Sequence, residues 1–169
     1  MLPKDFVHKF YPFALQTEKK TGISAIFILA QAALESGWGT SIPGNMFFGV
    51  KASKHTPSHK KQLLTTKEIF SEDSPRIRAK FPAVIKVEKR TDGKFIYTVK
   101  DWFRKYDTPE ECFTEHGNFF IKNSRYSKAL LVKNDPYKFA TEVAAAGYAT
   151  ATNYAGTLHK LIDTIKKYV

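Results

Sequence analysis

Apolar residues near the start of the chain recur at the spacing of an amphipathic helix. They occupy positions i, i+4, i+7 and i+8, and they are Phe6, Phe10, Phe13 and Ala14. Residues at this spacing line one side of an α-helix, and a glycine such as Gly22 commonly ends one. We therefore predict a first helix over about residues 3–20.

The next stretch, residues 23–34, is almost entirely apolar. Ser24 is well placed as the N-cap of a helix that begins there. Gly37 follows the stretch, and glycine is the usual residue just beyond a helix. The pattern predicts a buried second helix that ends at about Ser36.

Signals for β-structure are confined to the middle of the chain, after a loop-like stretch over residues 37–62. Asp92-Gly93 separates two β-rich runs, which is a strong signal for a hairpin turn. Alternation places Phe95, Tyr97 and Val99 on one face of that hairpin. The predicted strands are residues 63–70, 84–90 and 95–99.

The last part of the chain returns to helical patterns. Thr108 and Glu111 have the spacing of a capping box and predict a helix that runs to about Lys122. Another helix starts at Asp135-Pro136 and ends near Gly147. A last helix begins near Asn153, and its apolar stripe consists of Leu158, Leu161, Ile162, Ile165 and Tyr168. We predict an α+β fold, mainly α, in which residues 1–169 form a single domain with a small β part.

Composition and charge narrow the class of partner. The chain has 169 residues, of which 43% are hydrophobic and 24 are aromatic, as is typical of a globular protein. The formal net charge of +11 favours a polyanionic partner, such as nucleic acid, an anionic membrane surface or an anionic cell-wall polymer. No apolar run reaches the length of about 18 residues that a membrane span needs, so we expect no stable membrane insertion.

Metal, thiol and cofactor chemistry are poorly supported. Cys112 is the only cysteine, which excludes an intrachain disulfide and a metal site built on thiolates. His55 and His59 have an i, i+4 spacing, but no His-Glu-x-x-His motif accompanies them. No phosphate-binding glycine motif is present, so the sequence predicts neither a metal nor a cofactor.

Glu35 has the clearest potential for acid–base chemistry. It follows the apolar stretch and precedes Gly37, Trp38 and Gly39. Desolvation at the mouth of an apolar helix disfavours the charged carboxylate. A carboxylic acid that stays protonated near neutral pH can give its proton to a leaving group. Trp38 offers a flat apolar face of the kind on which sugar rings pack.

Several blocks of the sequence resemble one enzyme family. Residues 32–39 are Ala-Ala-Leu-Glu-Ser-Gly-Trp-Gly, and residues 45–52 are Asn-Met-Phe-Phe-Gly-Val-Lys-Ala. Together they resemble the signature of bacterial peptidoglycan N-acetylglucosaminidases, glycoside hydrolase family 73, which includes the flagellar rod-cap muralytic domain. The resemblance continues in order over about residues 5–165, through blocks at residues 65–68, 102–106, 124–126, 146–150 and 153–154.

The resemblance implies a lysozyme-like fold, with a helical lobe, a β lobe and a polysaccharide groove between them. It also implies hydrolysis of the β-1,4 bond between N-acetylglucosamine and N-acetylmuramic acid. The partner would be a glycan strand of peptidoglycan, an anionic polymer that accounts for the positive charge, whereas no recognised nucleic-acid motif appears. We expect a monomer that acts in the periplasm, in the cell wall or outside the cell, a phage lysin included. The N-terminus lacks the apolar core of a signal peptide, so no export route is visible.

The resemblance also implies roles for individual residues. Glu35 matches the general acid. Glu68 matches the glutamate of the family's Thr-x-Glu segment and is the candidate second carboxylate, which would activate water or stabilise the cationic intermediate. An insertion relative to the compact family pattern follows Glu68, so Glu88 is a rival for this role. Tyr148 matches a tyrosine near the catalytic centre, where a phenol could hydrogen-bond the acetamido group or steer water.

Six further residues are expected to bind sugar. The main candidates are Trp38, Asn45, Phe47 and Phe48, and the weaker ones are Tyr126 and Tyr154. The family usually has Asn-Asn-Leu-Phe-Gly where this chain has Gly44 followed by Asn-Met-Phe-Phe-Gly, so packing around the sugar could differ. Phe47 and Phe48 could equally fill the core.

Related activities stay open. A lytic transglycosylase of the same fold would form a 1,6-anhydro product without water, and a muramidase would cut the other glycosidic bond. A wall-binding module with decayed catalytic residues would cut neither. Hydrolysis itself could retain or invert the configuration, or use the acetamido group of the substrate as nucleophile.

Overall fold

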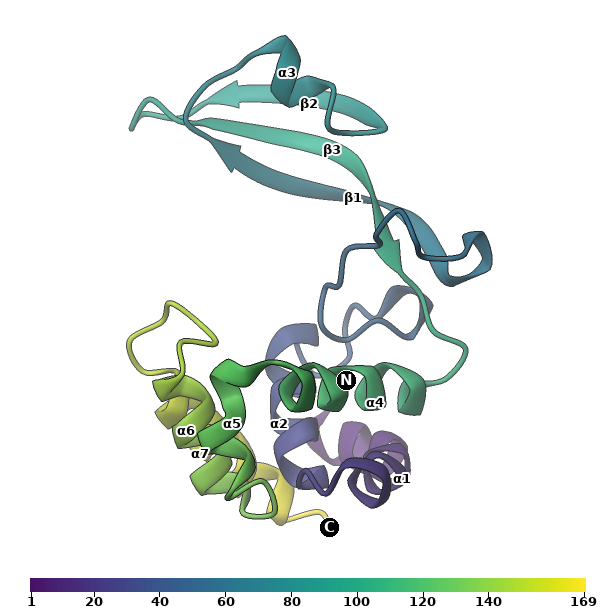
Figure 1. The fold of residues 1–169 in the computed structure, drawn as a ribbon, viewed down its shortest axis with the longest axis vertical. Coiled ribbons are helices and arrows are strands. Elements are labelled where there is room, and N and C mark those ends of the chain that lie inside the picture. Colours follow the sequence, from purple (N-terminus) through teal and green to yellow (C-terminus); the bar gives the residue numbers. More distant parts are fainter. The chain divides into compact units, whose positions relative to one another are not determined.

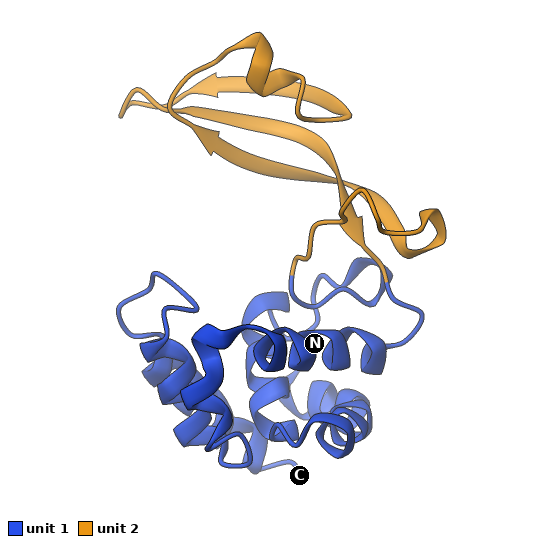
Figure 2. Ribbon diagram, viewed as in Figure 1, with its two compact units in different colours: residues 1–48, 106–169 blue, residues 49–105 orange.

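The chain divides into two compact units in the computed structural model, which describes all of residues 1–169 (Figure 2). The helical unit comprises residues 1–48 and 106–169, and the sheet unit comprises residues 49–105. The helical unit is therefore discontinuous in the sequence, because the chain leaves it after Phe48 and returns to it at Tyr106.

Six α-helices build the helical unit (Figure 1). They are α1 (Pro3–Thr21), α2 (Ala25–Ser36), α4 (Pro109–Lys122), α5 (Ser127–Leu130), α6 (Pro136–Ala145) and α7 (Tyr154–Lys166). Short 3-10 turns cover Pro43–Asn45 and Ser124–Tyr126. The five longer helices confirm the sequence-based predictions to within about two residues at each end. The pattern does not predict α5, because four residues are too few to show a helical period.

The start of α2 differs from the expected cap. Ser24 occupies the N-cap position, but its side chain makes no capping hydrogen bond. Instead, the amide of Ala25 donates to the carboxylate of Glu18 at 2.7 Å. A negative charge at this end of a helix also interacts favourably with the helix dipole. Glu18 belongs to α1, so the local sequence around Ser24 gives no sign of it.

Three antiparallel strands and one short helix build the sheet unit (Figure 1). They are β1 (Lys61–Phe70), α3 (Pro75–Arg78), β2 (Ala83–Lys89) and β3 (Phe95–Arg104), with a 3-10 turn at Ser58–Lys60. The strand order is β1-β3-β2. The predicted hairpin is confirmed, with Gly93 at a φ of +85° in the turn between β2 and β3. Strands β1 and β3 are longer than expected because they pair over their whole length, from Lys61 opposite Arg104 to Phe70 opposite Phe95.

One face of the sheet carries the core of the sheet unit. Tyr97 and Val99 of β3 are fully buried on it, and Ile77 of α3 packs against them. Phe95 was expected on the same face and is only half-buried, because it lies at the end of the strand. Partly buried hydrophobic residues complete this core, namely Phe70, Phe81, Val84 and Val87.

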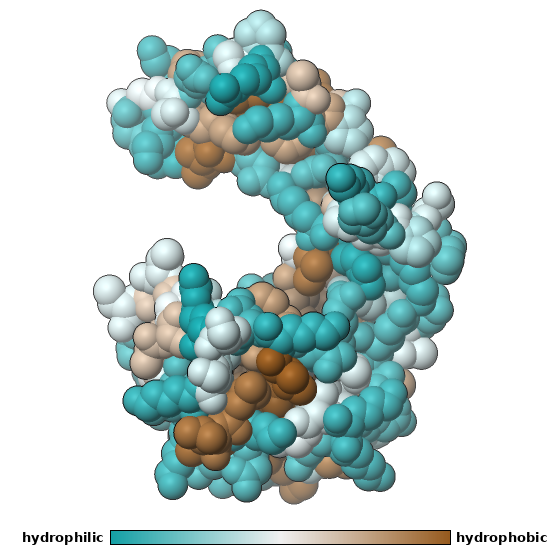
Figure 3. Space-filling view, in the orientation of Figure 1, coloured by the Kyte–Doolittle hydropathy of each residue, from teal (hydrophilic) through white to brown (hydrophobic).

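Hydrophobic side chains on the visible surface gather in separate patches rather than in one continuous band (Figure 3). None of the helices combines the length and the apolar character that crossing a membrane requires.

Candidate active site

Helix α2 places Glu35 in its last turn. The chain turns out of the helix at Gly37, whose φ of +57° is a left-handed conformation that favours glycine. Beyond it, the amide of Trp38 donates to the carbonyl of Ala33 at 2.8 Å. This bond closes the end of the helix and fixes the backbone that carries Glu35.

The carboxyl group of Glu35 ionises less readily than that of an ordinary glutamate. Its partial burial raises its pKa, although part of the residue stays exposed at the surface. The C-terminal end of a helix carries a partial negative charge, which also disfavours a second negative charge, and the last turn of α2 holds no basic residue. Glu35 is therefore suited to hold a proton and to release it, as acid catalysis requires.

Two phenols accompany Glu35. The rings of Tyr148 and Tyr154 lie 5.6 Å apart with an interplanar angle of 24°, and the buried ring of Tyr126 is 6.4 Å from that of Tyr148. Burial raises the pKa of Tyr148 and of Tyr154, and the negative charge of Glu35 adds to both shifts. Tyr154 is hydrogen-bonded to Gln31, which lies one turn before Glu35 on α2, and Tyr148 stacks on Tyr154, so both phenols belong to this end of the helix. They stay protonated and can donate hydrogen bonds.

A buried hydrogen-bond chain orients Tyr154. The amide nitrogen of Gln31 donates to the Tyr154 hydroxyl oxygen at 2.8 Å, and Nε2 of His116 donates to the amide oxygen of Gln31 at 2.6 Å. The Tyr154 oxygen is thus an acceptor within the protein, and its own proton is available for another acceptor. Sequence reasoning missed Gln31, although a glutamine inside an almost unbroken apolar stretch is a sign of a buried polar contact.

The buried His116 makes stability depend on pH. Burial lowers the pKa of its imidazole to about 3, whereas a histidine in an unfolded chain titrates near pH ~6.5. Between these values the unfolded chain binds a proton that the native protein does not. The stability is therefore full above the unfolded pKa and falls as the pH decreases. We expect this residue alone to lower the free energy of unfolding by about 2 kcal/mol between about pH 7 and about pH 5.

Urea unfolding at the two pH values measures this difference. His116→Gln should remove most of it, whereas His55→Gln, at an exposed residue, should leave it unchanged. A wild-type stability that does not change over this range would contradict a neutral, buried His116.

Three further rings, those of Phe48, His116 and Phe119, lie next to the tyrosine cluster. The ring of His116 stacks on that of Phe48 at 3.7 Å and 13°, and it lies parallel to that of Phe119 at 6.2 Å and 8°. Phe48 is half-buried and Phe119 is 44% exposed, so both keep apolar surface open to solvent. The ring of Phe119 is 6.4 Å from that of Tyr148. Sequence reasoning missed Phe119, which lies on α4 outside every motif.

Two of the residues expected to bind sugar make contacts within the protein: one packs in the core and the other holds a loop by hydrogen bonds. Phe47 is only 2% exposed and packs in the core of the helical unit, which favours the core alternative for this residue. The side-chain amide of Asn45 donates to the backbone oxygens of Tyr106 and Asp107 at 3.0 and 3.2 Å, so Asn45 fastens its own loop.

Trp38 keeps part of its ring exposed. It is half-buried, with its ring edge-on to that of Phe6 at 5.5 Å. Its φ of +56° is rare for a bulky residue, and such conformations cluster at functional sites.

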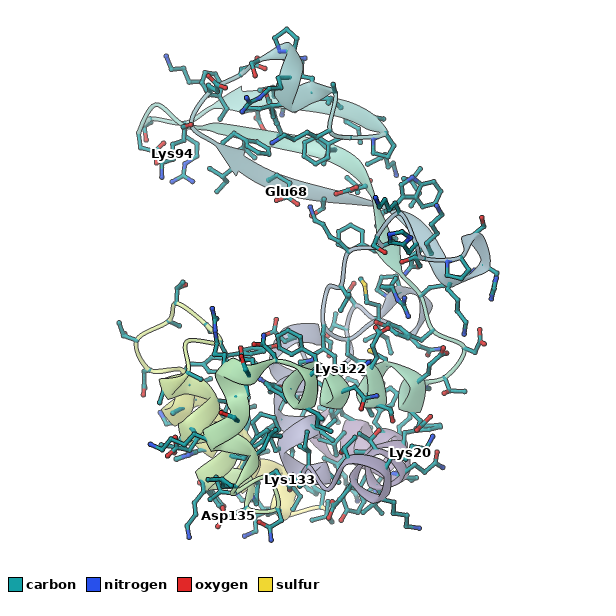
Figure 4. The ribbon with its side chains drawn as sticks, in the orientation of Figure 1. Lys20, Glu68, Lys94, Lys122, Lys133 and Asp135 are labelled. Atoms are coloured by element: carbon teal, nitrogen blue, oxygen red, sulfur yellow. The ribbon has the colours of Figure 1, made fainter.

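Glu68 belongs to the sheet unit and projects from β1 (Figure 4). Its carboxylate accepts a hydrogen bond from Nζ of Lys51 at 2.5 Å. Lys51 also forms an ion pair with Asp101 at 3.0 Å. Glu68 and Asp101 thus share one lysine, which compensates part of their negative charge.

Glu88 lies in different surroundings from Glu68. Glu68 of β1 and Val87 of β2 both pair with Tyr97 of β3, so they share its face of the sheet. Glu88 follows Val87 and points to the opposite face. It is half-exposed, and a surface ion pair with Lys86 at 2.8 Å lowers its pKa.

The cysteine lacks the character of a nucleophile. Cys112 is buried, and burial raises the pKa of its thiol to about 12. The thiolate is the reactive form of cysteine, so this group is unreactive near neutral pH. No group of three or more His, Cys, Asp or Glu side chains is arranged to hold a metal ion.

A glutamate with a raised pKa, with phenols that can donate hydrogen bonds, suits the acid step of a glycoside hydrolase. The chain belongs to the glucosaminidase family, described as mannosyl-glycoprotein endo-beta-N-acetylglucosaminidase, whose model matches residues 11–167. The expected family and the expected α+β, mainly α, fold class are confirmed.

Relatives of known name agree with this family. The chain is 27% identical to the peptidoglycan hydrolase FlgJ of Pseudomonas aeruginosa over 171 residues, which are 97% of this chain and 37% of that protein. It is 28% identical to the exo-glucosaminidase LytG of Bacillus subtilis over 142 residues, 80% of this chain and 42% of that protein. The chain thus spans less than half the length of these relatives.

A solved structure matches nearly the whole chain. It is the C-terminally truncated glycoside hydrolase domain of FlgJ from Salmonella typhimurium, with a TM-score of 0.74 and 28% sequence identity. The match covers 98% of this chain and 99% of that domain, so helices and sheet belong to one recurring fold.

Proposed function

We propose that this protein is a peptidoglycan hydrolase that cleaves the β-1,4 bond between N-acetylglucosamine and N-acetylmuramic acid, with Glu35 as the general acid. The observation that carries the proposal is the raised pKa of a glutamate at the end of an apolar helix, beside two protonated phenols. The family match and the relatives named as peptidoglycan hydrolase and exo-glucosaminidase support it.

The reaction begins with proton transfer from Glu35 to the glycosidic oxygen. Cleavage passes through a state resembling an oxocarbenium ion, and protonation of the leaving oxygen lets it depart without a full negative charge. Tyr148 and Tyr154 can donate hydrogen bonds, and the chain through Gln31 fixes the oxygen of Tyr154. A phenol in this place suits the carbonyl of the 2-acetamido group or an attacking water.

We propose Glu68 as the second carboxylate of the reaction. Its carboxylate is held by an ion pair with Lys51, and a carboxylate so placed can activate water or stabilise a cationic intermediate. Glu68→Gln should lower kcat/KM for wall hydrolysis by about tenfold or more. Glu88→Gln, which removes the same charge from the opposite face of the sheet, should change it by less than about twofold.

Turbidity loss of purified wall at matched protein concentrations measures both variants, and their thermal unfolding controls for stability. A larger rate loss for Glu88→Gln than for Glu68→Gln would reverse the assignment. Equal, small losses would favour the acetamido group of the substrate as the nucleophile, because that route depends less on a second carboxylate.

We further propose that both units act as one glucosaminidase domain over residues 1–169, since the family match runs from the helical unit through the sheet unit and back. Its partner is then the glycan strand of peptidoglycan. Action takes place where this polymer lies, in the periplasm or outside the cell.

Mass spectrometry of peptidoglycan digested by the wild-type protein tests the proposed bond. Chains that end in reducing N-acetylglucosamine would support it. Reducing N-acetylmuramic acid would identify a muramidase, and 1,6-anhydro ends would identify a lytic transglycosylase. The absence of soluble product would favour a wall-binding module.

A further inference from the structure

The positive charge of the protein is concentrated in the sheet unit. Residues 49–105 contain 15 Lys and Arg against 6 Asp and Glu, a net charge of +9. The helical unit contains 12 against 10, a net charge of only +2. The basic residues of the sheet unit lie in one continuous stretch of the sequence, which folds as that unit. The sheet unit therefore carries most of the attraction for an anionic partner.

A hollow of about 430 Å³ opens on the sheet unit, at the edge of β3 opposite β1, where β2 gives way to residues 51–52 as the neighbour of β3. Ala83 of β2 pairs with Lys100, and two residues further along β3 the amide of Ala52 donates to the carbonyl of Trp102 at 2.9 Å. The hollow lies at the break between these two partners. Its lining comes from residues 52–54, 79–82 and 101–102 and from Lys61.

Three lysines and an indole line the hollow. Nζ of Lys80 lies 5.7 Å from the centre of the Phe70 ring, outside the lining, and the other two lysines are Lys54 and Lys61. Trp102 is 39% exposed, and Nζ of Lys61 lies 4.9 Å from the centre of its ring. Lys54 is exposed on the rim, and neither lysine forms an ion pair with a carboxylate. The one acidic residue of the lining, Asp101, is already paired with Lys51 at 3.0 Å. The hollow thus presents positive charge beside a flat apolar face.

We propose that this hollow of the sheet unit binds a carboxylate-bearing segment of a peptidoglycan strand. A sugar ring would pack on the indole of Trp102, and the ammonium groups of Lys54 and Lys61 would hold a carboxylate of the peptide stem, or that of the lactyl group where the stem has been removed. The volume is at the lower end of that of small-molecule sites, which suits about one sugar unit. The proposal rests on peptidoglycan as the substrate and adds a second place at which the polymer is held.

Co-sedimentation with insoluble peptidoglycan, stripped of phosphate-containing polymers, tests the proposal. All proteins carry Glu35→Gln, so that the polymer is not cut during the measurement. The double variant Lys54→Gln/Lys61→Gln should weaken binding by about three- to tenfold at low salt, as expected for two exposed charge contacts. Trp102→Ala should weaken it by a similar factor.

The matched control removes two lysines from the other end of the same sheet. Lys89 and Lys94 lie beside the hairpin turn, where Figure 4 labels Lys94, and Nζ of Lys89 also lies over an aromatic ring, that of Phe95, at 5.9 Å. Lys89→Gln/Lys94→Gln lowers the net charge by the same amount. It should weaken binding by less than about twofold.

Chemical modification of the wall identifies the group that the lysines bind. Converting the carboxylates of the wall to neutral amides should abolish the difference between the two double variants. Equal losses for both variants, or a difference that survives amidation, would overturn the proposal. If the two double variants differed more in their binding to single-stranded DNA than in their binding to wall, the proposal would be overturned in favour of nucleic acid. The result does not depend on bond cleavage, so it stands apart from the product analysis that tests the proposed function.

Discussion

Glu35→Gln is expected to lower wall hydrolysis by about 10²–10⁴-fold, the range that a positioned general acid contributes. Glutamine keeps the shape of the side chain and removes the proton that the leaving oxygen needs. Because Glu35 lies at the surface end of α2, the free energy of unfolding should change by less than about 0.5 kcal/mol. Release of reducing ends from purified wall, followed over time, measures the loss.

Glu142→Gln is a matched control, since Glu142 is another helical glutamate of the helical unit and forms an ion pair with Lys128 at 3.4 Å. It should hydrolyse wall at the wild-type rate. The wild-type rate should also fall on the alkaline side of its profile as Glu35 loses its proton, at a pH above the usual range of a glutamate, because the pKa of Glu35 is raised. Near-normal lysis by Glu35→Gln would contradict the assignment.

Phe47→Ala should lower the free energy of unfolding by about 3–5 kcal/mol, the usual cost of removing a buried phenylalanine ring. The ring of Phe47 lies 5.0 Å from that of Phe10 and 4.8 Å from that of Phe113, so its loss leaves a cavity between α1 and α4. This cost is a large part of the total stability of a typical domain. Urea unfolding at neutral pH measures it.

Phe48→Ala controls for the loss of an aromatic ring at the next position. Phe48 is half-buried, so its removal should cost markedly less stability. If Phe47→Ala instead left stability intact and raised KM for wall, Phe47 would be a sugar-binding residue after all.

The positions of helices and strands could be predicted because their signals are local. The stripe that begins at Phe6 and the proline after Asp135 each act within a few residues. The turn at Gly93 likewise needs only its neighbours. Features that depend on distant residues could not be predicted: Glu18 supplies the cap of α2, and pairing with β1 extends β3 to Arg104.

Residues of the candidate site likewise divide into those that the local sequence reveals and those that depend on distant contacts. Glu35 could be found because its apolar surroundings are adjacent in sequence. The chain from His116 through Gln31 to Tyr154 joins residues 85 and 123 positions apart, so no local pattern contains it. Phe47 and Phe48 are neighbours of the same type, and only the packing of α1 and α4 separates the core residue from the half-exposed one.

Because the helical unit is discontinuous in the sequence, its first part is synthesised before the sheet unit and its second part after it. The sheet unit is one continuous segment and has all of its strands once residue 105 has been made. Helix α2, nearly all of which is buried, is made early but packs against α7 at the far end of the chain. On the ribosome α1 can cover one part of this helix, but the part that α7 covers stays open until the last helix emerges, while the sheet unit already has the residues it needs to fold.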